Sequence, residues 1–503
     1  MSALMQGDAA GVVAALDQMG VARQRMTLDS REVRTGDVFV AIPGSRVDGR
    51  HFIEPALIAG AAAVLCEAGG GNGDWNDPRV LHVSRLSANL GDIAGEFYGR
   101  PAAKMRVFGV TGTNGKTSIT NWLMQAYCLL GTPCAAIGTL GVSLGNQKWP
   151  TSNTTPDAVR LQTILRDVRE AGAAAAAMEV SSHALELGRV QGMRFDTAIF
   201  TNLTQDHLDF HGTMAAYGAA KTKLFTDFPL RHRVINADDS FGRDLISLQL
   251  PDTISYGLQA ADVRGSIRAM RRDGMHLTIS YAGDHIEVQS ALIGRFNASN
   301  LLAVAAALLV DGVQLAEVGA VLPKLQAAPG RMQRVAVASD AGPRVYVDYA
   351  HTPDALAKAL ETVRETQPAS LAVVFGCGGN RDRSKRPLMG SVAAGSADRV
   401  FVTSDNPRDE DPPSIINDIL AGIPDSVRPQ TREIASRGAA IDQAIAEAAA
   451  DDAVLIAGKG HEDYQEVGGV RLPFSDVAQA EAALLVWQRR SSQIAGGGNH
   501  VAG

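Results

Sequence analysis

The sequence predicts an α/β fold in three domains, and three observations lead to this prediction. The chain has 503 residues, roughly three times the length of an ordinary domain. Its hydrophobic content of 46% is enough for several buried cores. Short apolar runs alternate with amphipathic helical patterns, most regularly after residue 334, and this alternation is typical of mostly parallel sheets with helices on their faces.

The predicted domain boundaries fall where these patterns pause. The first domain spans residues 1–100, the second 101–333 and the third 334–490. Residues 491–503 are predicted to form a flexible tail, because they are glycine-rich and follow the last apolar pattern.

Apolar runs and helical periodicity predict the main elements of each domain. Thr352 and Pro353 have the residue types of a helix N-cap and first helical position, so a helix is expected to begin there. The expected strands are 38–42, 62–66, 106–110, 197–201, 345–349, 371–375, 400–403 and 453–457, and the expected helices include 86–98 and 118–130.

Composition limits the class of protein. A formal net charge of −7 argues against non-specific binding of nucleic acid, so an anionic substrate must meet local basic groups. The four cysteines form no Cys-x-x-Cys pattern and are expected to be buried thiols in a reducing compartment. Without a signal-peptide pattern or a long apolar run, the chain is expected to be cytoplasmic and not bound to a membrane.

A glycine-rich turn between an apolar strand pattern and a helical pattern predicts a nucleotide-phosphate site. Glycines let backbone N–H groups turn toward phosphate oxygens, Lys116 can reach the terminal phosphates, and Thr117 can bind Mg²⁺. The loop is a variant, because Val110 stands where the standard pattern has glycine and Gly109 lies one residue earlier. The alternative is a plain strand-to-helix turn, which leaves the lysine and threonine unexplained. The loop residues are Gly112, Thr113, Asn114, Gly115, Lys116, Thr117 and Ser118.

Carboxylates and imidazoles follow two strand patterns of the second domain. Glu179 begins the stretch 179–183, and His207 and His211 lie in the stretch 202–211. A zinc site is an alternative for the two histidines, but the glutamate that accompanies such a pair in metalloproteases is absent. Mg²⁺ held by Glu179, a histidine and phosphates is therefore the favoured interpretation.

Three strand patterns of the third domain end in polar sequences, at 376–381, 404–408 and 458–462. In open α/β sheets ligands bind at the carboxyl ends of strands, so these sequences predict one site. Arginines there can bind carboxylates and acidic residues can bind an ammonium group, which suits a zwitterionic amino acid with an extra acid group. The residues are Arg381, Asp405, Arg408 and Glu462.

Four motifs in this order resemble those of the Mur ligase family, and the resemblance covers nearly the whole chain. They are Gly-Thr-Asn-Gly-Lys-Thr at 112–117, Glu-Val-Ser-Ser-His at 179–183, Thr-Asn-Leu-x-x-Asp-His-Leu-Asp at 201–209 and Asp-Tyr-Ala-His-x-Pro at 348–353. Within the family, the chain is most similar to the members that add the third peptide residue. Its Asp-Asn-Pro-Arg at 405–408 resembles the motif of the members that use meso-diaminopimelate.

The resemblance implies an N-terminal UDP-substrate domain, a central P-loop ATPase domain with a mostly parallel sheet, and a C-terminal Rossmann-like domain. It implies a monomer that uses ATP, Mg²⁺, UDP-N-acetylmuramoyl-L-alanyl-D-glutamate and meso-diaminopimelate. The D-glutamyl γ-carboxylate would attack the ATP γ-phosphate, and the diaminopimelate amine would then displace phosphate from the acyl phosphate. The protein's part in this chemistry is positioning and charge neutralisation.

The resemblance also implies roles for single residues. Lys221, which by composition would be a solvated helix lysine, matches a position that the family carries as an N-carboxylated lysine. Leu187 departs from the family pattern, which often has glutamine there. The implied catalytic residues are Lys116, Glu179, His207 and Lys221, and the implied metal ligands are Thr117, Glu179, His207 and Lys221 as its carbamate.

The remaining implied roles concern binding of the three substrates. Besides the phosphate loop, ATP would contact Asn297, Asn300, Arg331 and Asp348. The UDP-substrate would contact Leu28, Ser30, Ser45, Arg46, Val47, Asn153, Thr154, Thr155, Ser181 and Arg189. Diaminopimelate would contact Arg381, Asp405, Asn406, Pro407, Arg408, Gly458 and Glu462.

Other functions are considered beside this one. A GTPase would need a guanine-reading Asn-Lys-x-Asp sequence, which the chain lacks. Folylpolyglutamate synthetase or another Mur ligase would share the phosphate loop and the acyl phosphate, but not the Asp-Asn-Pro-Arg motif or the Leu-Asp-Ser-Arg sequence at 28–31. A nucleotide-binding scaffold without activity would not need charged groups at so many strand ends.

Overall fold

The computed structural model describes residues 5–44, 47–69, 75–151, 153–335, 337 and 342–497. Its contacts divide the chain into two compact units. The first comprises residues 1–264, 280–283 and 300–321, and the second comprises residues 265–279, 284–299 and 322–503.

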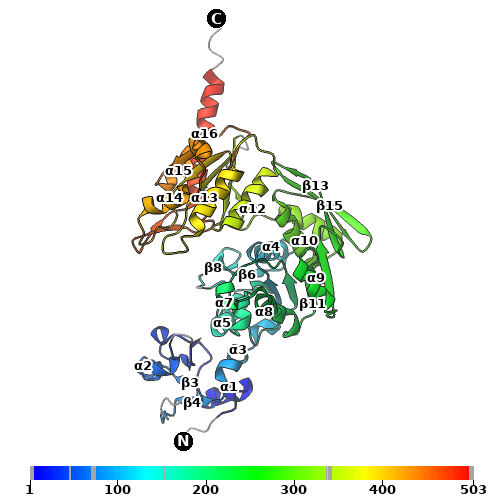
Figure 1. Ribbon diagram of the computed structural model, residues 1–503. Coiled ribbons are helices and arrows are strands. Elements are labelled where there is room, and N and C mark those ends of the chain that lie inside the picture. The colour runs from blue at the N-terminus through cyan, green and yellow to red at the C-terminus, as the bar shows by residue number, and fades with distance from the viewer. Residues whose placement is uncertain are drawn as a thin grey trace. The chain divides into compact units, whose positions relative to one another are not determined.

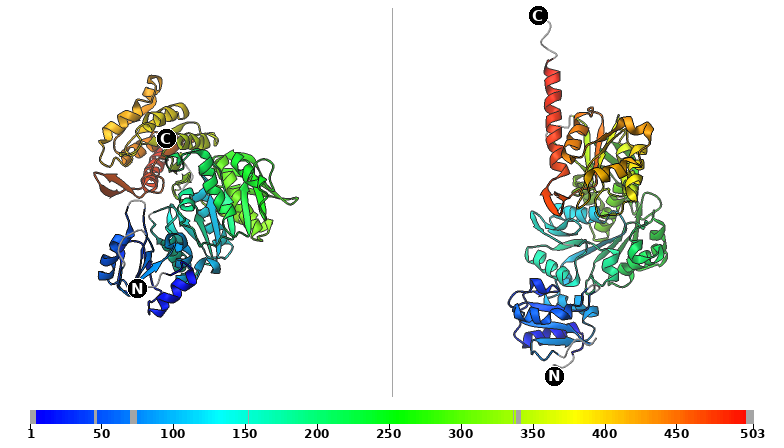
Figure 2. Two further views of the ribbon diagram at one scale, coloured as in Figure 1. Left: turned by 60° about the horizontal axis from the view of Figure 1, so that its bottom comes forward. Right: turned by 60° about the vertical axis from the view of Figure 1, so that its left-hand side comes forward.

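The N-terminal part of the first unit is a parallel four-stranded sheet in the order β1-β2-β3-β4 (Figures 1 and 2). Alternate residues of β2 point to opposite faces: Val38 and Val40 pack with α1 and α3, whereas Phe39 packs with α2. Helices therefore cover both faces. The elements are α1 (Ala9–Gln18), β1 (Met26–Thr27), β2 (Val38–Ala41), α2 (Ile53–Ile58), β3 (Ala63–Glu67), β4 (Val80–Val83) and α3 (Leu86–Phe97), with short 3₁₀ turns at Ser30–Glu32, Gly49–Phe52 and Pro101–Lys104.

The larger sheet of the first unit has β5 at its centre, paired in parallel with β10 on one side and β9 on the other. β11 and β12 continue the parallel pairing beyond β10, and β6 continues it beyond β9; β7 and β8 are antiparallel. The sheet is thus mostly parallel, as predicted. The strands of this sheet that lie wholly in the first unit are β5 (Arg106–Thr111), β6 (Cys134–Gly138), β7 (Gly141–Leu144), β8 (Gln147–Trp149), β9 (Ala175–Glu179), β10 (Thr197–Phe200), β11 (His232–Asn236) and β12 (Thr253–Gly257).

The predicted strand-loop-helix around the glycine-rich turn is confirmed, with α4 beginning at Lys116 instead of residue 118. Gly115 is the N-cap of α4 with a φ of 89°. The helices of this part are α4 (Lys116–Leu129), α5 (Ala158–Glu170), α6 (Ser182–Glu186), α7 (Leu208–His211), α8 (Met214–Thr226), α9 (Ser240–Ser247) and α11 (Leu315–Val321). Three further elements contain residues of both units: β13 (Val263–Arg271), β14 (Gly274–Tyr281) and α10 (Arg295–Val310). β15 (Asp284–Ser290) lies in the second unit.

The second unit contains a six-stranded sheet in the order β16-β17-β21-β18-β19-β20, parallel except for β16. On β18, Val373 and Phe375 pack with α12, α13 and α14, whereas Ala372 and Val374 pack with α15 and α16. This two-sided cover is the predicted Rossmann-like arrangement. The elements are β16 (Gln333–Arg334), β17 (Arg344–Asp348), α12 (Pro353–Arg364), β18 (Leu371–Phe375), α13 (Lys385–Ser396), β19 (Arg399–Val402), α14 (Pro412–Leu420), β20 (Thr431–Glu433), α15 (Arg437–Ala446), β21 (Ala453–Ala457), β22 (Tyr464–Val467), β23 (Val470–Pro473) and α16 (Asp476–Gly497), with 3₁₀ turns at Leu322–Lys324 and Asp425–Gln430.

Three expectations about boundaries and cysteines need correction. The predicted domain boundary at 333/334 falls inside β16, and the tail predicted from residue 491 falls inside α16, which continues to Gly497. Residues 498–503 lie outside the described part of the chain. Cys128 is exposed, while the other three cysteines are buried as expected. Within the described residues no helix is both long and apolar enough to cross a membrane.

A buried ion pair joins the first residues of α15 and α16. Both oxygens of Asp476 accept hydrogen bonds of 2.7 Å from Arg437, and both side chains are fully buried. Arg437 also donates to the carbonyl oxygens of Ser404 (3.4 Å), the first residue of the polar sequence 404–408, and of Ala457 (3.0 Å), which directly precedes the polar sequence 458–462. Arg437 therefore connects these two strand ends through hydrogen bonds to their backbone.

We expect Arg437→Met to lower the free energy of unfolding of the second unit by about 3–5 kcal/mol, because it leaves Asp476 buried without its partner. Urea unfolding followed by circular dichroism measures this change. The double variant Arg437→Met/Asp476→Leu should recover part of the loss, since it removes the uncompensated charge. Equal destabilisation by the two variants would contradict the proposed cause.

Candidate functional site

The phosphate loop donates hydrogen bonds to the segment that follows β10. Thr113 N donates to Asn202 O (2.8 Å), and Asn114 N donates to Asn202 Oδ1 (3.0 Å). Lys116 Nζ reaches back over the loop to the carbonyl oxygens of Gly112 (2.9 Å) and Thr113 (2.8 Å). The loop and its lysine thus form a defined cradle at the carboxyl end of the central strand, at the N-terminus of α4.

Two glycines of the loop are required by close approach as well as by backbone conformation. Gly112 has a φ of 144°, and a Cβ there would lie 1.8 Å from Thr201 Oγ1. Gly115 has a φ of 89°, and its Cβ would lie 2.6 Å from Asn300 Oδ1. Gly109 has a different reason: it lies within β5, where a Cβ would meet the Phe195 ring at 2.9 Å. Gly109 is therefore a packing glycine of the strand and not a displaced member of the loop.

Glu179 lies at the end of β9 with a side chain that is only 2% exposed. Thr117 Oγ1 lies 3.0 Å from each of its carboxylate oxygens. Thr139, directly after β6, donates its backbone N–H to Glu179 Oε1 at 2.8 Å. A Cβ on Gly138 would lie 2.2 Å from that same oxygen, so the backbone closes around the carboxylate. Glu179 is thus fixed beside the hydroxyl expected to bind metal.

Lys221 is buried at the phosphate loop, with 1% of its surface exposed, although composition alone suggests a solvated lysine. Its Nζ donates to Gly112 O (2.9 Å) and lies 4.4 Å from the centre of the Tyr217 ring. Burial, reinforced by the positive charge of Lys116, lowers the pKa of Lys221 well below its usual value. An amine of this kind is available in its neutral form.

Three imidazoles, those of His183, His207 and His211, lie close together. His207 is exposed, lies 3.5 Å from Asp206 and has a left-handed φ of 53°. The ring of His183 lies 4.8 Å from that of His207 and 5.5 Å from that of His211, and His211 Nε2 is 2.9 Å from Ser182 Oγ. Burial lowers the pKa of all three histidines, so they favour the neutral form that can bind a metal.

The donor set fits Mg²⁺. Within the described residues, no three His, Cys, Asp or Glu side chains form a ready-made metal cage. Mg²⁺ typically needs no such cage, because it binds one or two protein oxygens together with substrate phosphates and water. Thr117 and Glu179, fixed side by side beneath the phosphate loop, are suited to that role.

The residues expected to bind the muramoyl-dipeptide form a hydrogen-bonded chain leading to Glu179. Thr155 Oγ1 donates to the backbone oxygen of Glu179 (2.9 Å) and lies 3.2 Å from Ser181 Oγ, while Arg189 donates to Thr155 O (3.2 Å). Thr154 Oγ1 lies 3.1 Å from Thr139 Oγ1. Asn153 precedes them in the same segment. These residues are brought together with the phosphate loop.

Of the residues expected to hold the uridine end, Leu28, Ser30 and Val47 lie in described parts of the N-terminal domain. Leu28 is partly buried against its core, Ser30 begins a 3₁₀ turn and Val47 is exposed. No contact described here joins them to the phosphate loop. Ser45 and Arg46 lie outside the described residues. Leu187 is 56% exposed, so its apolar side chain is not needed for packing there.

The expected nucleotide contacts are divided between the two units. Asn300 is buried against Gly115 of the loop, whereas Asn297 is buried and donates to Ile293 O of its own helix start (2.8 Å). In the second unit, Asp348 accepts hydrogen bonds from Met332 N (2.6 Å) and Ala350 N (2.9 Å). Arg331 stacks 4.9 Å above the Tyr349 ring, and burial raises the pKa of Asp348.

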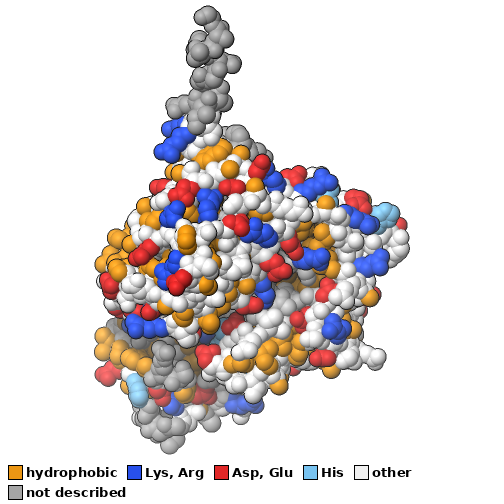
Figure 3. Space-filling view, turned by 45° about the horizontal axis from the view of Figure 1, so that its top comes forward, with side chains coloured by type: hydrophobic (Ala, Val, Ile, Leu, Met, Phe, Trp, Pro, Cys, Tyr) orange, Lys and Arg blue, Asp and Glu red, His pale blue; other side chains and the backbone are white. Residues whose placement is uncertain are grey.

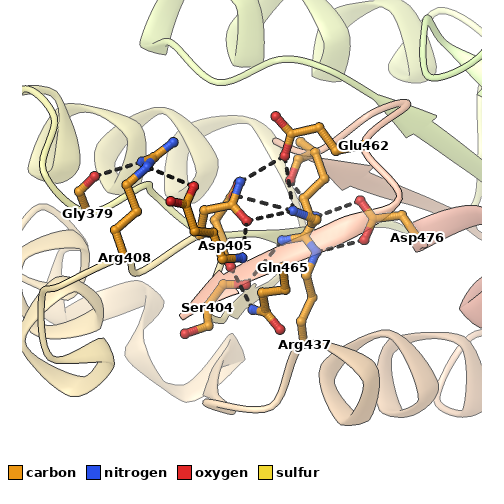
Figure 4. Close-up of polar contacts among 12 residues, drawn as sticks. Gly379, Ser404, Asp405, Arg408, Arg437, Glu462, Gln465 and Asp476 are labelled. Atoms are coloured by element: carbon orange, nitrogen blue, oxygen red, sulfur yellow. Dashed lines mark hydrogen bonds and ion pairs between the residues drawn. The ribbon is translucent and has the colours of Figure 1, made fainter. Parts of the chain in front are cut away.

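The polar strand ends of the second unit converge as predicted (Figure 4). Asp405 and Asn406 are buried after β19, and a Cβ on Gly458 would lie 2.5 Å from Asp405 Oδ2. Asn406 Nδ2 donates to Glu462 Oε2 at 2.8 Å. Pro407 is also buried, and Arg381 is exposed. Burial raises the pKa of Asp405, and the charge of Arg437 partly offsets this effect.

Arg408 is held in an unusual conformation at this site, with a left-handed φ of 52°. Its Nη1 donates to Gly379 O (2.7 Å), and its Nε lies 3.4 Å from Glu466 Oε2. Its backbone N–H donates to Glu466 O (3.0 Å). A non-glycine residue in this region costs energy and persists where its surroundings over-determine it, which is common at ligand sites.

Glu410 ties the loop of Arg408 to the loop of Arg381. It accepts hydrogen bonds from Asn380 N (2.6 Å) and from the fully buried Arg386 (2.9 and 3.0 Å). These hydrogen bonds, above all those from Arg386, lower the pKa of Glu410 to about 2. Glu410 is therefore a carboxylate under all ordinary conditions.

Several residues of these sites were not predicted from the sequence. Thr139 follows a strand pattern like the other site residues, so its position was a usable signal, whereas nothing local marks Tyr217. Lys459 lies inside the polar sequence 458–462 but received no role. The unpredicted residues are Thr139, Asn202, Tyr217, Arg386, Glu410, Arg437, Lys459 and Asp476.

The visible surface carries both signs of charge. Figure 3 shows Lys and Arg side chains interspersed with Asp and Glu on the face that it displays.

Comparisons with known proteins match the whole architecture. Models of the Mur ligase family match three successive stretches: the "Mur ligase family, catalytic domain" residues 24–98, the "Mur ligase middle domain" residues 110–308, and the "Mur ligase, glutamate ligase domain" residues 330–460. The three matches follow one another along the chain, in agreement with a three-domain fold.

Relatives with curated names are similar over almost their full length. Proteins of Chromobacterium violaceum and Pseudomonas aeruginosa, both named "UDP-N-acetylmuramoyl-L-alanyl-D-glutamate--2,6-diaminopimelate ligase", are each 49% identical; the matches cover 95% and 92% of this chain and 97% and 96% of theirs. A solved structure with the same name is 37% identical, with a TM-score of 0.70, over 92% of this chain and 95% of that one. The chain therefore belongs to the Mur ligase family.

Proposed function

We propose that this protein is an ATP-dependent ligase of the MurE type. It joins meso-diaminopimelate to the D-glutamyl γ-carboxylate of UDP-N-acetylmuramoyl-L-alanyl-D-glutamate, in the cytoplasmic synthesis of peptidoglycan precursors. The observation that carries the proposal is the acceptor site of the second unit, where Arg408, Asp405 and Glu462 lie at neighbouring strand ends. The names of the similar proteins support it.

The residues of the first unit suit the first step. Backbone N–H groups of the phosphate loop and Lys116 would offset the charge of the triphosphate as the γ-carboxylate approaches it. The carboxylate oxygen forms a bond to the γ-phosphorus, and the bond to the ADP oxygen breaks. Mg²⁺, when bound, supplies further neutralisation; Thr117 and Glu179 would hold one ion, and His207 and the Lys221 carbamate another.

The second step joins the amine to the activated carbonyl. The amine nitrogen of diaminopimelate attacks the acyl phosphate, the C–O bond to phosphate breaks, and the nitrogen loses a proton. Arg381 and Arg408 would bind the carboxylates of the amino acid, and Asp405 and Glu462 its remaining ammonium group. In this way the second unit selects the acceptor and the first unit activates the donor.

We further propose that Lys221 is carbamylated by CO₂. Its burial at the loop, beside the cation of Lys116, makes a positive charge there unfavourable, and a carbamate converts it into an anion suited to Mg²⁺. We expect protein incubated with ¹³C-bicarbonate to give a carbamate carbon signal by NMR that Lys221→Arg lacks. The exposed Lys358→Arg serves as the control. A signal that persists in Lys221→Arg would contradict the assignment.

A ligation assay tests the proposed function. Purified UDP-N-acetylmuramoyl-dipeptide, ATP and Mg²⁺ are incubated with meso-diaminopimelate, L-lysine or glutamate, and product and ADP are quantified. We expect tripeptide product with meso-diaminopimelate and matching ADP release. Product with glutamate instead would support a folylpolyglutamate-type ligase, and ATP hydrolysis independent of any acceptor would refute the ligase proposal.

A further inference from the structure

Lys459 is a buried cation within the acceptor site. Its side chain is 0% exposed, between the end of β21 and β22. Its Nζ lies 3.0 Å from Asn406 Oδ1, 3.1 Å from Glu462 Oε2 and 3.9 Å from Asp405 Oδ1. Lysine is almost never fully buried unless it is paired, so these three contacts account for its position.

The contacts of Lys459 determine how Asn406 is oriented. Asn406 Oδ1 accepts hydrogen bonds from Lys459 Nζ and from Glu466 N (2.9 Å). An amide oxygen with two donors leaves the NH₂ group to face the other way, and Asn406 Nδ2 donates to Glu462 Oε2 (2.8 Å). Lys459, Asn406 and Glu462 therefore form a closed triangle of hydrogen bonds.

The same triangle directs the Glu462 carboxylate. Both of its described hydrogen bonds, from Lys459 and Asn406, are made by Oε2. Oε1 takes part in none of the hydrogen bonds described for this part of the chain. Figure 4 shows Glu462 at one side of the cluster, with Asp405 between it and Arg408.

Lys459 also balances the charge of the site. Asp405 and Glu462 are both acidic, and the nearby Arg437 is already paired with Asp476. Without Lys459, these two carboxylates would lose the cation whose Nζ lies 3.1 Å from Glu462 Oε2 and 3.9 Å from Asp405 Oδ1.

We propose that Lys459 is a positioning residue of the acceptor site, which holds Asn406 and Glu462 so that Glu462 Oε1 can bind the ammonium group of the acceptor amino acid. The inference rests on the proposed function and deepens it. Lys459 itself does not contact the reacting atoms. It acts through Glu462, and this distinguishes it from a residue that only stabilises the fold.

Lys459→Met tests the proposal, with the exposed Lys358→Met as its matched control. Lys358 forms an ion pair with Asp354 on its own helix. We expect Lys459→Met to raise the KM for meso-diaminopimelate about 10- to 100-fold, the effect of losing a charged hydrogen bond, while the KM for ATP and for the UDP-substrate change less than about twofold. Parallel changes in all three KM values, or no change for meso-diaminopimelate, would overturn the proposal.

A double-variant cycle with Glu462→Gln tests whether Lys459 acts through Glu462. In the Glu462→Gln background, Lys459→Met should change the KM for meso-diaminopimelate less than about twofold. A full additional effect would overturn the proposal. If Lys459→Met does not fold, Lys459→Arg carries the test, since it keeps the charge but displaces the donor; a selective rise in the KM for meso-diaminopimelate supports the proposal, and its absence overturns it.

The wild-type protein separates the two levels of inference. If it does not ligate meso-diaminopimelate, the proposed function fails. If it does, and Lys459→Met leaves the KM for that amino acid unchanged, only the role of Lys459 fails.

Discussion

Replacing Lys116 by alanine is expected to abolish ATP-dependent ligation while leaving the fold intact. Lys116 Nζ lies 2.9 Å from Gly112 O and 2.8 Å from Thr113 O, so its charge is held over the loop where the triphosphate would bind. Without it, the charge that develops on the transferred phosphoryl group loses its principal protein cation. We expect kcat to fall at least about 10³-fold, as for other removed transition-state charge contacts.

The measurement is release of ADP with all substrates present, together with tripeptide formation. The exposed Lys104→Ala is a matched control in the same unit and should retain wild-type turnover. Circular dichroism should show both variants folded. Near-normal turnover in Lys116→Ala would contradict the phosphate-loop assignment.

The phosphate loop could be predicted because its signals are local. A short apolar run, two glycines and a helical pattern are adjacent in the sequence, and the structure confirms β5, the loop and α4. The role of Gly109 could not be read locally, because it depends on Phe195, a residue from a distant part of the chain. The apparently displaced glycine of the motif is explained by packing.

The environment of Lys221 illustrates the limit of local patterns. A lysine on an alanine-rich helix is ordinarily solvated, and only the family resemblance indicated otherwise. Its burial depends on contacts with Gly112 and Tyr217, of which Gly112 is 109 positions away. The contacts of Thr139 and Lys459 are also made with distant parts of the sequence, since their partners Glu179 and Asn406 are 40 and 53 positions away.

The prediction of domain boundaries from the sequence is limited by a different cause. Periodicity predicts that a segment forms strands or helices, but not which core it packs against. Residues 265–279 and 284–299 were assigned to the middle domain by their place in the sequence, whereas their contacts group them with the second unit. The helix at the C-terminus continues past residue 491, to Gly497.

Arg408 is expected to make the protein strongly selective for meso-diaminopimelate over L-lysine, because the two amino acids differ by one carboxylate. The arginine is already fixed by its hydrogen bond to Gly379 O (2.7 Å) and its ion pair with Glu466 (3.4 Å). Binding of lysine would leave this oriented guanidinium without the carboxylate it is placed to meet. Sites built for a polar group reject analogues that lack it by about 10⁴-fold in kcat/KM.

Arg408→Met should therefore lower kcat/KM for meso-diaminopimelate about 10²- to 10⁴-fold while changing that for lysine far less, so that the selectivity collapses. Arg408→Lys should be intermediate, since it keeps the charge but loses the bidentate geometry. The exposed Arg432→Met is the control and should keep wild-type selectivity.

Competition between the two amino acids in one reaction, with the tripeptides separated by chromatography, measures the selectivity directly. Comparable kcat/KM values for both in the wild-type protein would contradict the role of Arg408. Unchanged selectivity in Arg408→Met would indicate that Arg381, the other arginine of the proposed acceptor site, determines the selectivity. Because Arg381 is exposed and Arg408 is held in a strained backbone conformation by its neighbours, we expect Arg408 to be the residue that distinguishes the two amino acids.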